Sequence, residues 1–232
     1  MKTIGLIGGM SWESTVTYYQ VINETVRQQL GGLHSAKILL YSVEFDEIER
    51  CQSKGDWEES ARILSDAAKR LEIAGADFIV ICTNTMHKVA REVRESVSVP
   101  LLHIADVTAG KLREAGIMVV GLLGTCYTMT QAFYRDVLTD NGIQVLVPGE
   151  EEIRRVNDII FDELCMGIVR EASKEALLRA IHQLQSRGAQ GVILGCTELG
   201  LLVGESDVDL PVFDTALIHA REAALEALRE KN

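Results

Sequence analysis

The sequence predicts an α/β protein of two pseudo-symmetric Rossmann-like lobes, each a short parallel sheet with helices on both faces, with the active site in the cleft between them. Short apolar segments alternate with amphipathic ones through the whole chain, which is the pattern of parallel strands joined by helices. Three strand segments also recur in the same order in the second half, which indicates an internal repeat. Sheets of this kind bind ligands outside the carboxyl ends of their strands.

The first half of the chain alternates between strands and helices, with one polar interruption. The opening strand runs into a glycine turn, after which one face of a helix carries Val16, Tyr19, Ile22 and Val26. The polar residues 44–57 are expected to be irregular and to carry binding groups, as loops on a rigid scaffold often do. We expect strands at 2–10, 36–43, 75–83 and 99–104, and helices at 11–30, 57–74, 86–97 and 107–115.

The second half repeats the landmarks of the first. The matched residues are Gly5 with Gly121, Gly75 with Gly188 and Pro100 with Pro211, at offsets of 116, 113 and 111 residues. The offset of 113 also places Thr83 opposite Cys196, so that a hydroxyl and a thiol follow equivalent strands. We expect strands at 117–125, 143–147, 188–196 and 210–214, and helices at 128–140, 151–172 with a break near Gly167, 174–187 and 216–229. We expect the first lobe to comprise residues 1–98 plus 209–232, and the second 99–208.

Composition narrows the partners and the compartment. The 232 residues carry a formal net charge of −11, which argues against a nucleic-acid or anionic membrane partner. The amino terminus runs straight into a strand without the apolar region of a signal peptide, so we expect a cytoplasmic protein. The five cysteines form no CxxC pair and the histidines share no ligand-like spacing, so neither disulfides nor a metal site are expected. The first glycine turn also lacks the GxGxxG of a dinucleotide site.

Two proton-transfer groups on opposite faces of a tetrahedral carbon suit a stereoinversion. One group removes a proton from one face, and the other returns a proton to the opposite face. Thr83 and Cys196 are placed for such roles by the repeat. We expect Cys196 to be the base, because a helix beginning there would lower the pKa of its thiol through the helix dipole and free backbone amides. The same amides would hold an α-carboxylate and stabilise the charge that develops on proton removal.

The chain resembles the aspartate/glutamate racemase superfamily over nearly its full length. The resemblance rests on the motifs Ile4-Gly5-Leu6-Ile7-Gly8-Gly9-Met10, Cys82-Thr83-Asn84-Thr85-Met86-His87 and Gly195-Cys196-Thr197-Glu198. Within the superfamily the chain is most similar to a bacterial subgroup of amino-acid racemases that includes an L-aspartate/glutamate-specific type. The resemblance implies an isomerase without pyridoxal phosphate or another cofactor, a small amino acid such as L-aspartate or L-glutamate as substrate, and a homodimer.

The chain departs from the family at one decisive position. Members typically carry a cysteine where this sequence has Thr83, and Cys82 lies one residue earlier, which in a strand points to the opposite face. The resemblance implies that Cys196 works on the α-proton of the L-isomer. With Thr83 as an atypical proton donor and acceptor on the other face, we expect the L-isomer to be the preferred substrate.

The residues expected to bind the substrate lie at strand ends and in the loop after the second strand. Gln52 is carried over from the resembling subgroup, and Cys165 stands where the family has a lysine for the substrate side chain. The expected set is Met10, Gln52, Asn84, Thr85, Thr125, Thr128, Thr197 and Glu198.

Three alternative functions are compatible with the same motifs. Because the cations expected for an acidic side chain are missing, a neutral amino acid such as homoserine fits as substrate. A single-thiol relative of this architecture decarboxylates a malonate, which makes a decarboxylase the enzymatic alternative. A protein that lost catalysis with the first cysteine would only bind amino acids. Participation of Cys82 or His87 is left open by the sequence.

Overall fold

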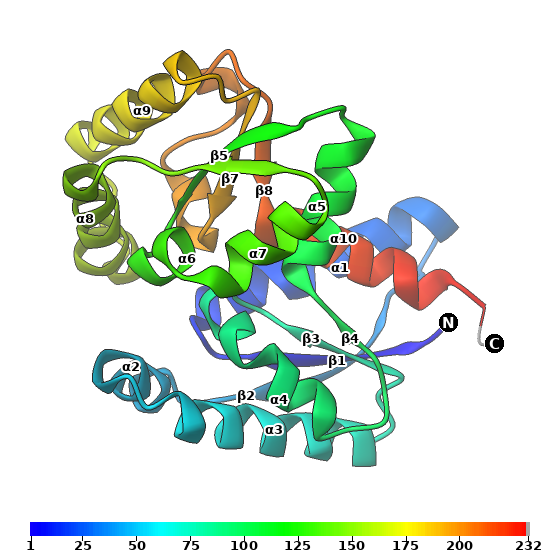
Figure 1. The fold of residues 1–232 in the computed structure, drawn as a ribbon. Coiled ribbons are helices and arrows are strands. Elements are labelled where there is room, and N and C mark those ends of the chain that lie inside the picture. The colour runs from blue at the N-terminus through cyan, green and yellow to red at the C-terminus, as the bar shows by residue number, and fades with distance from the viewer. Residues whose placement is uncertain (231–232) are drawn as a thin grey trace. The chain divides into compact units, whose positions relative to one another are not determined.

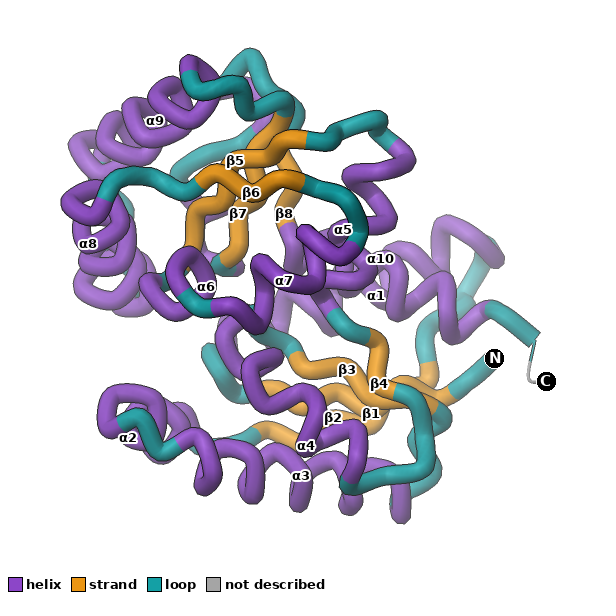
Figure 2. The backbone as a smooth tube through the Cα atoms, in the orientation of Figure 1, coloured by secondary structure: helices purple, strands orange, loops and turns teal. Residues whose placement is uncertain are grey.

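Two four-stranded parallel sheets form the framework of the chain, as the sequence predicts (Figure 1). The computed structural model describes residues 1–230. Helices connect the strands throughout this part of the chain (Figure 2). The alternation follows from the sequence, because each apolar strand segment can bury both of its faces only when helices cover the sheet on both sides.

The first sheet has the strand order β2-β1-β3-β4, and its neighbouring strands are parallel. Its strands are β1 (Thr3–Gly8), β2 (Lys37–Ser42), β3 (Phe78–Ile81) and β4 (Leu101–Leu102). The helices in this stretch are α1 (Trp12–Leu30), α2 (Phe45–Lys54), α3 (Trp57–Ile73), the 3-10 helix η1 (Thr85–Val89) and α4 (Ala90–Glu95). Figure 1 shows α3 running along one face of this sheet, where it contacts β1, β2 and β3.

The second sheet has the strand order β6-β5-β7-β8 and is again parallel. Its strands are β5 (Val119–Gly124), β6 (Gln144–Leu146), β7 (Gly191–Gly195) and β8 (Val212–Asp214). The α-helices are α5 (Ile104–Glu114), α6 (Cys126–Thr130), α7 (Ala132–Asp140), α8 (Glu150–Asp158), α9 (Glu171–Ser186) and α10 (Thr215–Leu228). Short helical turns are η2 (Ile159–Glu163), η3 (Leu164–Met166), η4 (Thr197–Leu201) and η5 (Glu205–Asp207).

The two sheets share one pairing register. The aligned partners are Ile4 with Phe78 and Ile79 with Leu101 in the first sheet, and Val120 with Gly191 and Val192 with Val212 in the second. These pairs are related by the offsets of 116, 113 and 111 residues read from the sequence. Thr83 and Cys196 therefore occupy equivalent positions just beyond β3 and β7.

The chain divides into two compact units. The first contains residues 1–104 and the described chain from His219 onward, and the second contains Ala105–Ile218. The sequence-based division assigned residues 99–104 to the second lobe and 209–214 to the first. In the structure β4 pairs with β3 and β8 pairs with β7. A strand belongs to the sheet that completes its backbone hydrogen bonds, so each half of the repeat keeps its own fourth strand.

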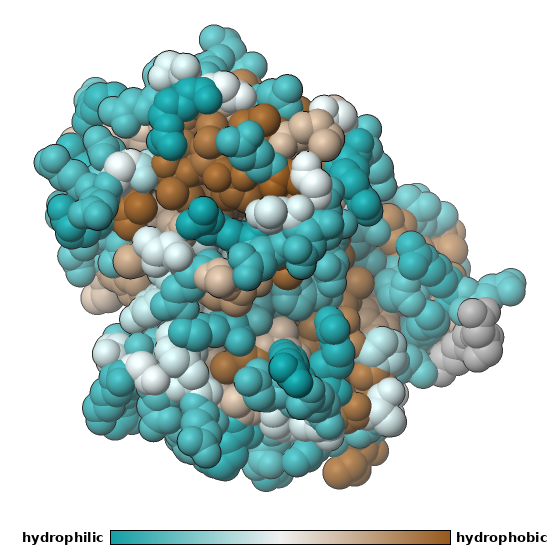
Figure 3. All heavy atoms as spheres, viewed as in Figure 1, coloured by the Kyte–Doolittle hydropathy of each residue, from teal (hydrophilic) through white to brown (hydrophobic). Residues whose placement is uncertain are grey.

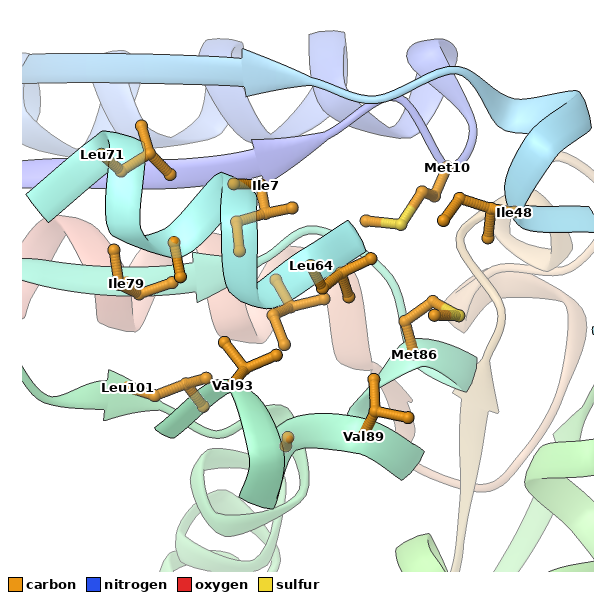
Figure 4. Packing of buried hydrophobic residues seen from close by; sticks show 14 of the residues in the cluster. Ile7, Met10, Ile48, Leu64, Leu71, Ile79, Met86, Val89, Val93 and Leu101 are labelled. Carbon is orange, nitrogen blue, oxygen red and sulfur yellow. The ribbon is translucent and has the colours of Figure 1, made fainter. Parts of the chain in front are cut away.

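The core of the first unit lies between its sheet and helices α3 and α4 (Figure 4). Ile7 and Ile79 project from the strands toward Leu64 and Leu71 of α3, while Val93 closes the cluster from α4. Each of these side chains is at most 3% exposed. Burying one such side chain contributes about 1.5–3 kcal/mol, so this cluster stabilises the packing of β1 and β3 against α3 and α4.

Helix α1 buries only part of the face that was expected. Ile22 and Val26 are fully buried as expected, whereas Val16 and Tyr19 are 54% and 56% exposed and Tyr18 is buried instead. The small polar residues Ser14 and Thr15 are buried on the inner side. The hydrophobic pattern misled here because the inner face of the first turn is polar and the outer face carries apolar side chains.

Residues 44–57 were expected to be irregular, and that prediction is wrong for most of the stretch. Helix α2 begins after Glu44, whose side-chain oxygens accept hydrogen bonds from the backbone N–H groups of Asp46 and Glu47. The helix ends at Gly55, which adopts the left-handed conformation. Local capping at both ends stabilises a helix whose composition is mainly polar.

The exposed surface in Figure 3 is mostly hydrophilic, with hydrophobic residues showing in separate patches. Among residues 1–230, no helix combines the length and the apolar character needed to cross a membrane.

Candidate active site

The second-half motif begins where β7 ends. Cys196 follows the strand in an extended conformation and is the N-cap of η4. Its thiol donates a hydrogen bond to Glu198 Oε2 at 2.9 Å. The hydroxyl of Thr197 donates to the same carboxylate oxygen at 2.7 Å. The three motif residues thus form a compact, partly buried polar group around one oxygen atom.

The expected lowering of the Cys196 pKa is contradicted by this geometry. Burial raises the pKa of the thiol well above its ordinary value, and the negative charge of Glu198 raises it further. The helix that follows is a five-residue 3-10 turn, so it supplies little of the dipole that a longer α-helix provides. In the resting protein Cys196 is therefore a neutral thiol that donates to a carboxylate.

The backbone around this motif is packed without room for side chains. A Cβ atom on Gly195 would lie 2.9 Å from the carbonyl oxygen of Leu123, and one on Gly124 would lie 3.0 Å from that of Gly195. Thr128 fills the adjacent space and is fully buried. Because Gly124 and Gly195 carry no side chains, the ends of β5 and β7 can lie side by side just before Cys196.

Two further expected residues meet at the start of the helix after β5, where Thr125 is the N-cap of α6. The Thr125 hydroxyl accepts a hydrogen bond from the backbone N–H of Thr128 at 3.3 Å, and the two hydroxyls are 3.2 Å apart. Thr125 is 6% exposed and Thr128 is fully buried. Both residues therefore shape the strand end in the second unit, with Thr125 nearer the surface.

The first-half motif separates its thiol from its hydroxyl. Cys82 is fully buried, and burial strongly raises the pKa of its thiol. Thr83 is partly exposed. Asn84 and Thr85 follow as the N-cap and first residue of η1 and are 3% and 7% exposed. The residue that the strand end presents to solvent is therefore the threonine.

His87 holds the backbone of this motif. Its Nδ1 lies 2.8 Å from the Thr83 carbonyl oxygen, and its Nε2 lies 3.2 Å from the backbone nitrogen of Ile104. Because the Ile104 N–H can only donate, Nε2 is the acceptor and Nδ1 carries the proton that Thr83 accepts. Burial, followed by neighbouring His103 and His219, lowers the pKa of His87, so the ring is neutral. The sequence signal for this contact with the Thr83 carbonyl is the position of His87 four residues after Thr83.

Gln52 and Met10 lie in the same unit as Thr83. Gln52 is 8% exposed, and its side-chain nitrogen lies 3.0 Å from the sulfur of Met86, one residue before His87. Met10 is 5% exposed and points into the same apolar cluster as Met86 (Figure 4). The helix α2 that was expected to be irregular therefore brings Gln52 to the end of the first-half motif.

The loop before Met10 requires glycine. A Cβ atom on Gly8 would lie 2.5 Å from the methyl carbon of Thr15, and Gly9 has a φ of 89°. The Gly9 N–H donates a hydrogen bond to Thr15 Oγ1 at 2.8 Å. This close approach ties the end of β1 to the first turn of α1.

The expected site residues thus fall into two groups. The first unit holds Met10, Gln52, Thr83, Asn84 and Thr85, and the second holds Thr125, Thr128, Cys196, Thr197 and Glu198. Apart from Gln52 on α2, they follow the carboxyl ends of β1 and β3 in the first unit and of β5 and β7 in the second. In the part of the chain that the structure describes, no cluster of three or more His, Cys, Asp or Glu side chains is arranged to hold a metal ion.

Comparison with known proteins places this arrangement in context. The sequence profile described as Asp/Glu/hydantoin racemase matches residues 7–223. The broad specificity amino-acid racemase RacX of Bacillus subtilis (strain 168) is 25% identical over 225 residues, which cover 94% of this chain and 95% of the relative.

Solved structures are similar over the whole length. A provisionally assigned Asp/Glu racemase from Yersinia pestis is 56% identical with a TM-score of 0.94, covering 99% of this chain and 100% of that one. An aspartate racemase homologue from Pyrococcus horikoshii OT3 is 40% identical with a TM-score of 0.87 and the same coverage. An arylmalonate decarboxylase shares the fold alone, at 13% identity and a TM-score of 0.54 over 99% of this chain and 94% of that one.

Proposed function

The chain belongs to the Asp/Glu/hydantoin racemase family, and from this premise we propose that it is a cofactor-independent racemase of aspartate or glutamate that prefers the L-isomer. The observation that carries the proposal is the equivalence of Thr83 and Cys196, which follow the same strand of the two repeats. A hydroxyl and a thiol at equivalent positions are two groups able to move protons, of unequal basicity.

The proposed reaction inverts Cα by transferring two protons. Cys196, as the thiolate, takes the α-proton of the L-isomer and becomes a neutral thiol. The electron pair left on Cα is delocalised into the substrate carboxylate as an enolate. Thr83, directly or through a water molecule, then delivers a proton to the opposite face. The cycle closes when Cys196 gives up the proton that it took and Thr83 or its water recovers a proton from solvent.

The inequality of the two groups affects rates and leaves the equilibrium unchanged. A threonine hydroxyl is a far weaker base than a thiolate, so removal of the α-proton from the D-isomer by Thr83 is slow. Racemisation of a free amino acid has an equilibrium constant of one, so the preference takes the form of different kcat and KM values for the two isomers.

Solvent exchange at Cα tests the assignment. In deuterium oxide, L-aspartate should exchange its α-proton faster than D-aspartate. Cys196→Ser should abolish exchange from the L-isomer, while Cys126→Ser, a partly exposed cysteine of the same unit, should leave it unchanged. Faster exchange from the D-isomer, or substantial exchange in Cys196→Ser, would refute the assignment of the base.

The remaining expected residues are proposed to bind the substrate. Met10, Gln52, Asn84 and Thr85 would do so from the first unit, and Thr125, Thr128 and Thr197 from the second. A screen of amino acids by chiral chromatography identifies the side chain, with homoserine as the neutral competitor. Release of carbon dioxide from a substituted malonate would favour the decarboxylase. Calorimetric binding of L-aspartate without exchange would favour an amino-acid-binding protein.

We also propose a cytoplasmic homodimer. Val16, Tyr19 and Leu33 are exposed on α1 and the loop after it, where Glu24 and Arg27 line the same surface hollow. Apolar side chains with both charge signs nearby suit a twofold interface, in which each copy presents the same patch. Light scattering should give twice the chain mass, and Tyr19→Asp should reduce it. A monomeric wild-type protein would refute this proposal.

A further inference from the structure

Glu198 accepts two hydrogen bonds on a single carboxylate oxygen. The Cys196 thiol donates at 2.9 Å and the Thr197 hydroxyl at 2.7 Å, both to Oε2. Both donors therefore converge on one oxygen, which lies within hydrogen-bond reach of the thiol. The proton of the thiol therefore already points at the atom best able to take it.

Burial is the largest factor that raises the pKa of the Cys196 thiol, and the backbone N–H of Glu198 acts in the opposite direction. The titratable groups that face Cys196 are Glu198 of η4 and Cys165 of η3, and both disfavour a negative charge on sulfur. Burial acts in the same direction. A thiol in this setting needs a proton acceptor within hydrogen-bond reach before it can serve as a base.

We propose that Glu198 is a catalytic residue that takes the thiol proton of Cys196 and so generates the thiolate that attacks the α-proton. This inference rests on the proposed racemase function and replaces the substrate-binding role expected for Glu198.

The proposed step balances in protons and charge. The S–H bond of Cys196 breaks and an O–H bond forms on Glu198 Oε2, so one negative charge moves from oxygen to sulfur. The Cα–H bond of the substrate then breaks, a new S–H bond forms, and the electron pair stays with the substrate. Glu198 later releases its proton to solvent. No additional reactant is required.

Thr197 has a positioning role in this scheme. Its hydroxyl donates a hydrogen bond to the same Oε2 atom and so holds the carboxylate next to the thiol. Thr197→Val should therefore lower kcat by a smaller factor than Glu198→Gln does, because the carboxylate that accepts the thiol proton is still present.

Two readouts on Glu198→Gln separate the possible roles. The first is exchange of the α-proton of L-aspartate, with kcat and KM measured apart. The second is the pH dependence of alkylation of Cys196 by iodoacetamide, followed on its own peptide by mass spectrometry. We expect kcat to fall on the order of 100-fold, the usual worth of a positioned base, with KM little changed. Alkylation near neutral pH should be faster, because a neutral amide no longer opposes the thiolate.

Matched variants make the result decisive. Glu198→Asp, which keeps a carboxylate on a shorter side chain, should retain part of kcat, and Glu205→Gln, on an exposed residue of the same unit, should match the wild type. Wild-type kcat in Glu198→Gln overturns the proposal, as does a loss that appears in KM alone, which would make Glu198 a substrate contact.

Failure of the racemase function is distinguishable from failure of this inference. If the wild type exchanges no amino acid, the proposed function fails, while the alkylation profiles still report on the thiol and carboxylate. Identical profiles for wild type and Glu198→Gln would then overturn the pairing. A profile shifted to lower pH in the variant would uphold Glu198 as the partner of the thiol.

Discussion

Acidification should destabilise the protein through His219, which must remain neutral inside the first unit. Its ring is fully buried, its Nδ1 lies 2.8 Å from the Tyr18 hydroxyl and its Nε2 lies 2.9 Å from the carbonyl oxygen of Leu102. The carbonyl can only accept, so Nε2 donates and Nδ1 accepts from Tyr18. Burial lowers the pKa of His219 to about 3.

The sign follows from proton linkage. An unfolded histidine has a pKa of about 6.5, so between that pH and about 3 the unfolded chain binds a proton that the folded chain does not. The stabilising contribution of His219 is complete above about pH 6.5 and is lost as the pH falls through this window. Each pH unit costs about 1.4 kcal/mol, so at about pH 5 the loss is about 2 kcal/mol. His87 has a lowered pKa as well and acts in the same direction.

Urea unfolding at about pH 7 and pH 5 measures this loss. His219→Gln keeps an N–H donor near the Leu102 carbonyl but cannot titrate. The variant should lose about 2 kcal/mol less than the wild type between the two pH values. His182→Gln, at an exposed position on α9, should behave as the wild type does. Equal pH dependence in His219→Gln and wild type would show that His219 does not resist protonation in the folded state.

Three further predictions concern single contacts. Gly195→Ala should lower the free energy of unfolding by about 1–3 kcal/mol in urea, because its Cβ would meet a β5 carbonyl oxygen at 2.9 Å; unchanged stability would mean that β5 and β7 can separate. Tyr18→Phe should cost about 1 kcal/mol and lower Tm, since it removes the donor to His219; an unchanged Tm would argue against that hydrogen bond. Lys174→Ala breaks a partly exposed ion pair with Asp207 and should cost less than about 1 kcal/mol, with the difference shrinking at 1 M NaCl; a larger, salt-independent loss would contradict a surface interaction.

The strands and their repeat were accessible from the sequence because buried parallel strands are nearly continuous apolar runs. Gly75 and Gly188 mark the turn before each central strand, and both adopt the same φ of 98°. The offsets then predicted the register found in the two sheets. The misplaced lobe boundary was avoidable, since the match of Pro100 with Pro211 already implied one such strand in each sheet.

The parts that were missed depend on side-chain geometry. Helix α2 is stabilised by capping from Glu44 and Gly55, which hydrophobic periodicity does not register. The inner face of α1 begins with polar residues, so periodicity selected Tyr19 over Tyr18. The pKa of Cys196 is raised first by burial and then by the Glu198 side chain, which turns toward the thiol. Sequence alone does not show whether side chains two residues apart turn toward or away from one another.

The shared register of the two sheets helps to explain how two equivalent positions can carry different residues, Thr83 in one half and Cys196 in the other. A protein assembled from two copies of a half-length chain is encoded by one gene, so any substitution at such a position changes both copies together. Once two copies are joined end to end, each position mutates independently. The chain keeps the strand order and pairing of its two halves while carrying a hydroxyl in one and a thiol in the other. The proposed difference in rate between the two isomers would depend on this independence, because it requires unlike groups at the two equivalent positions.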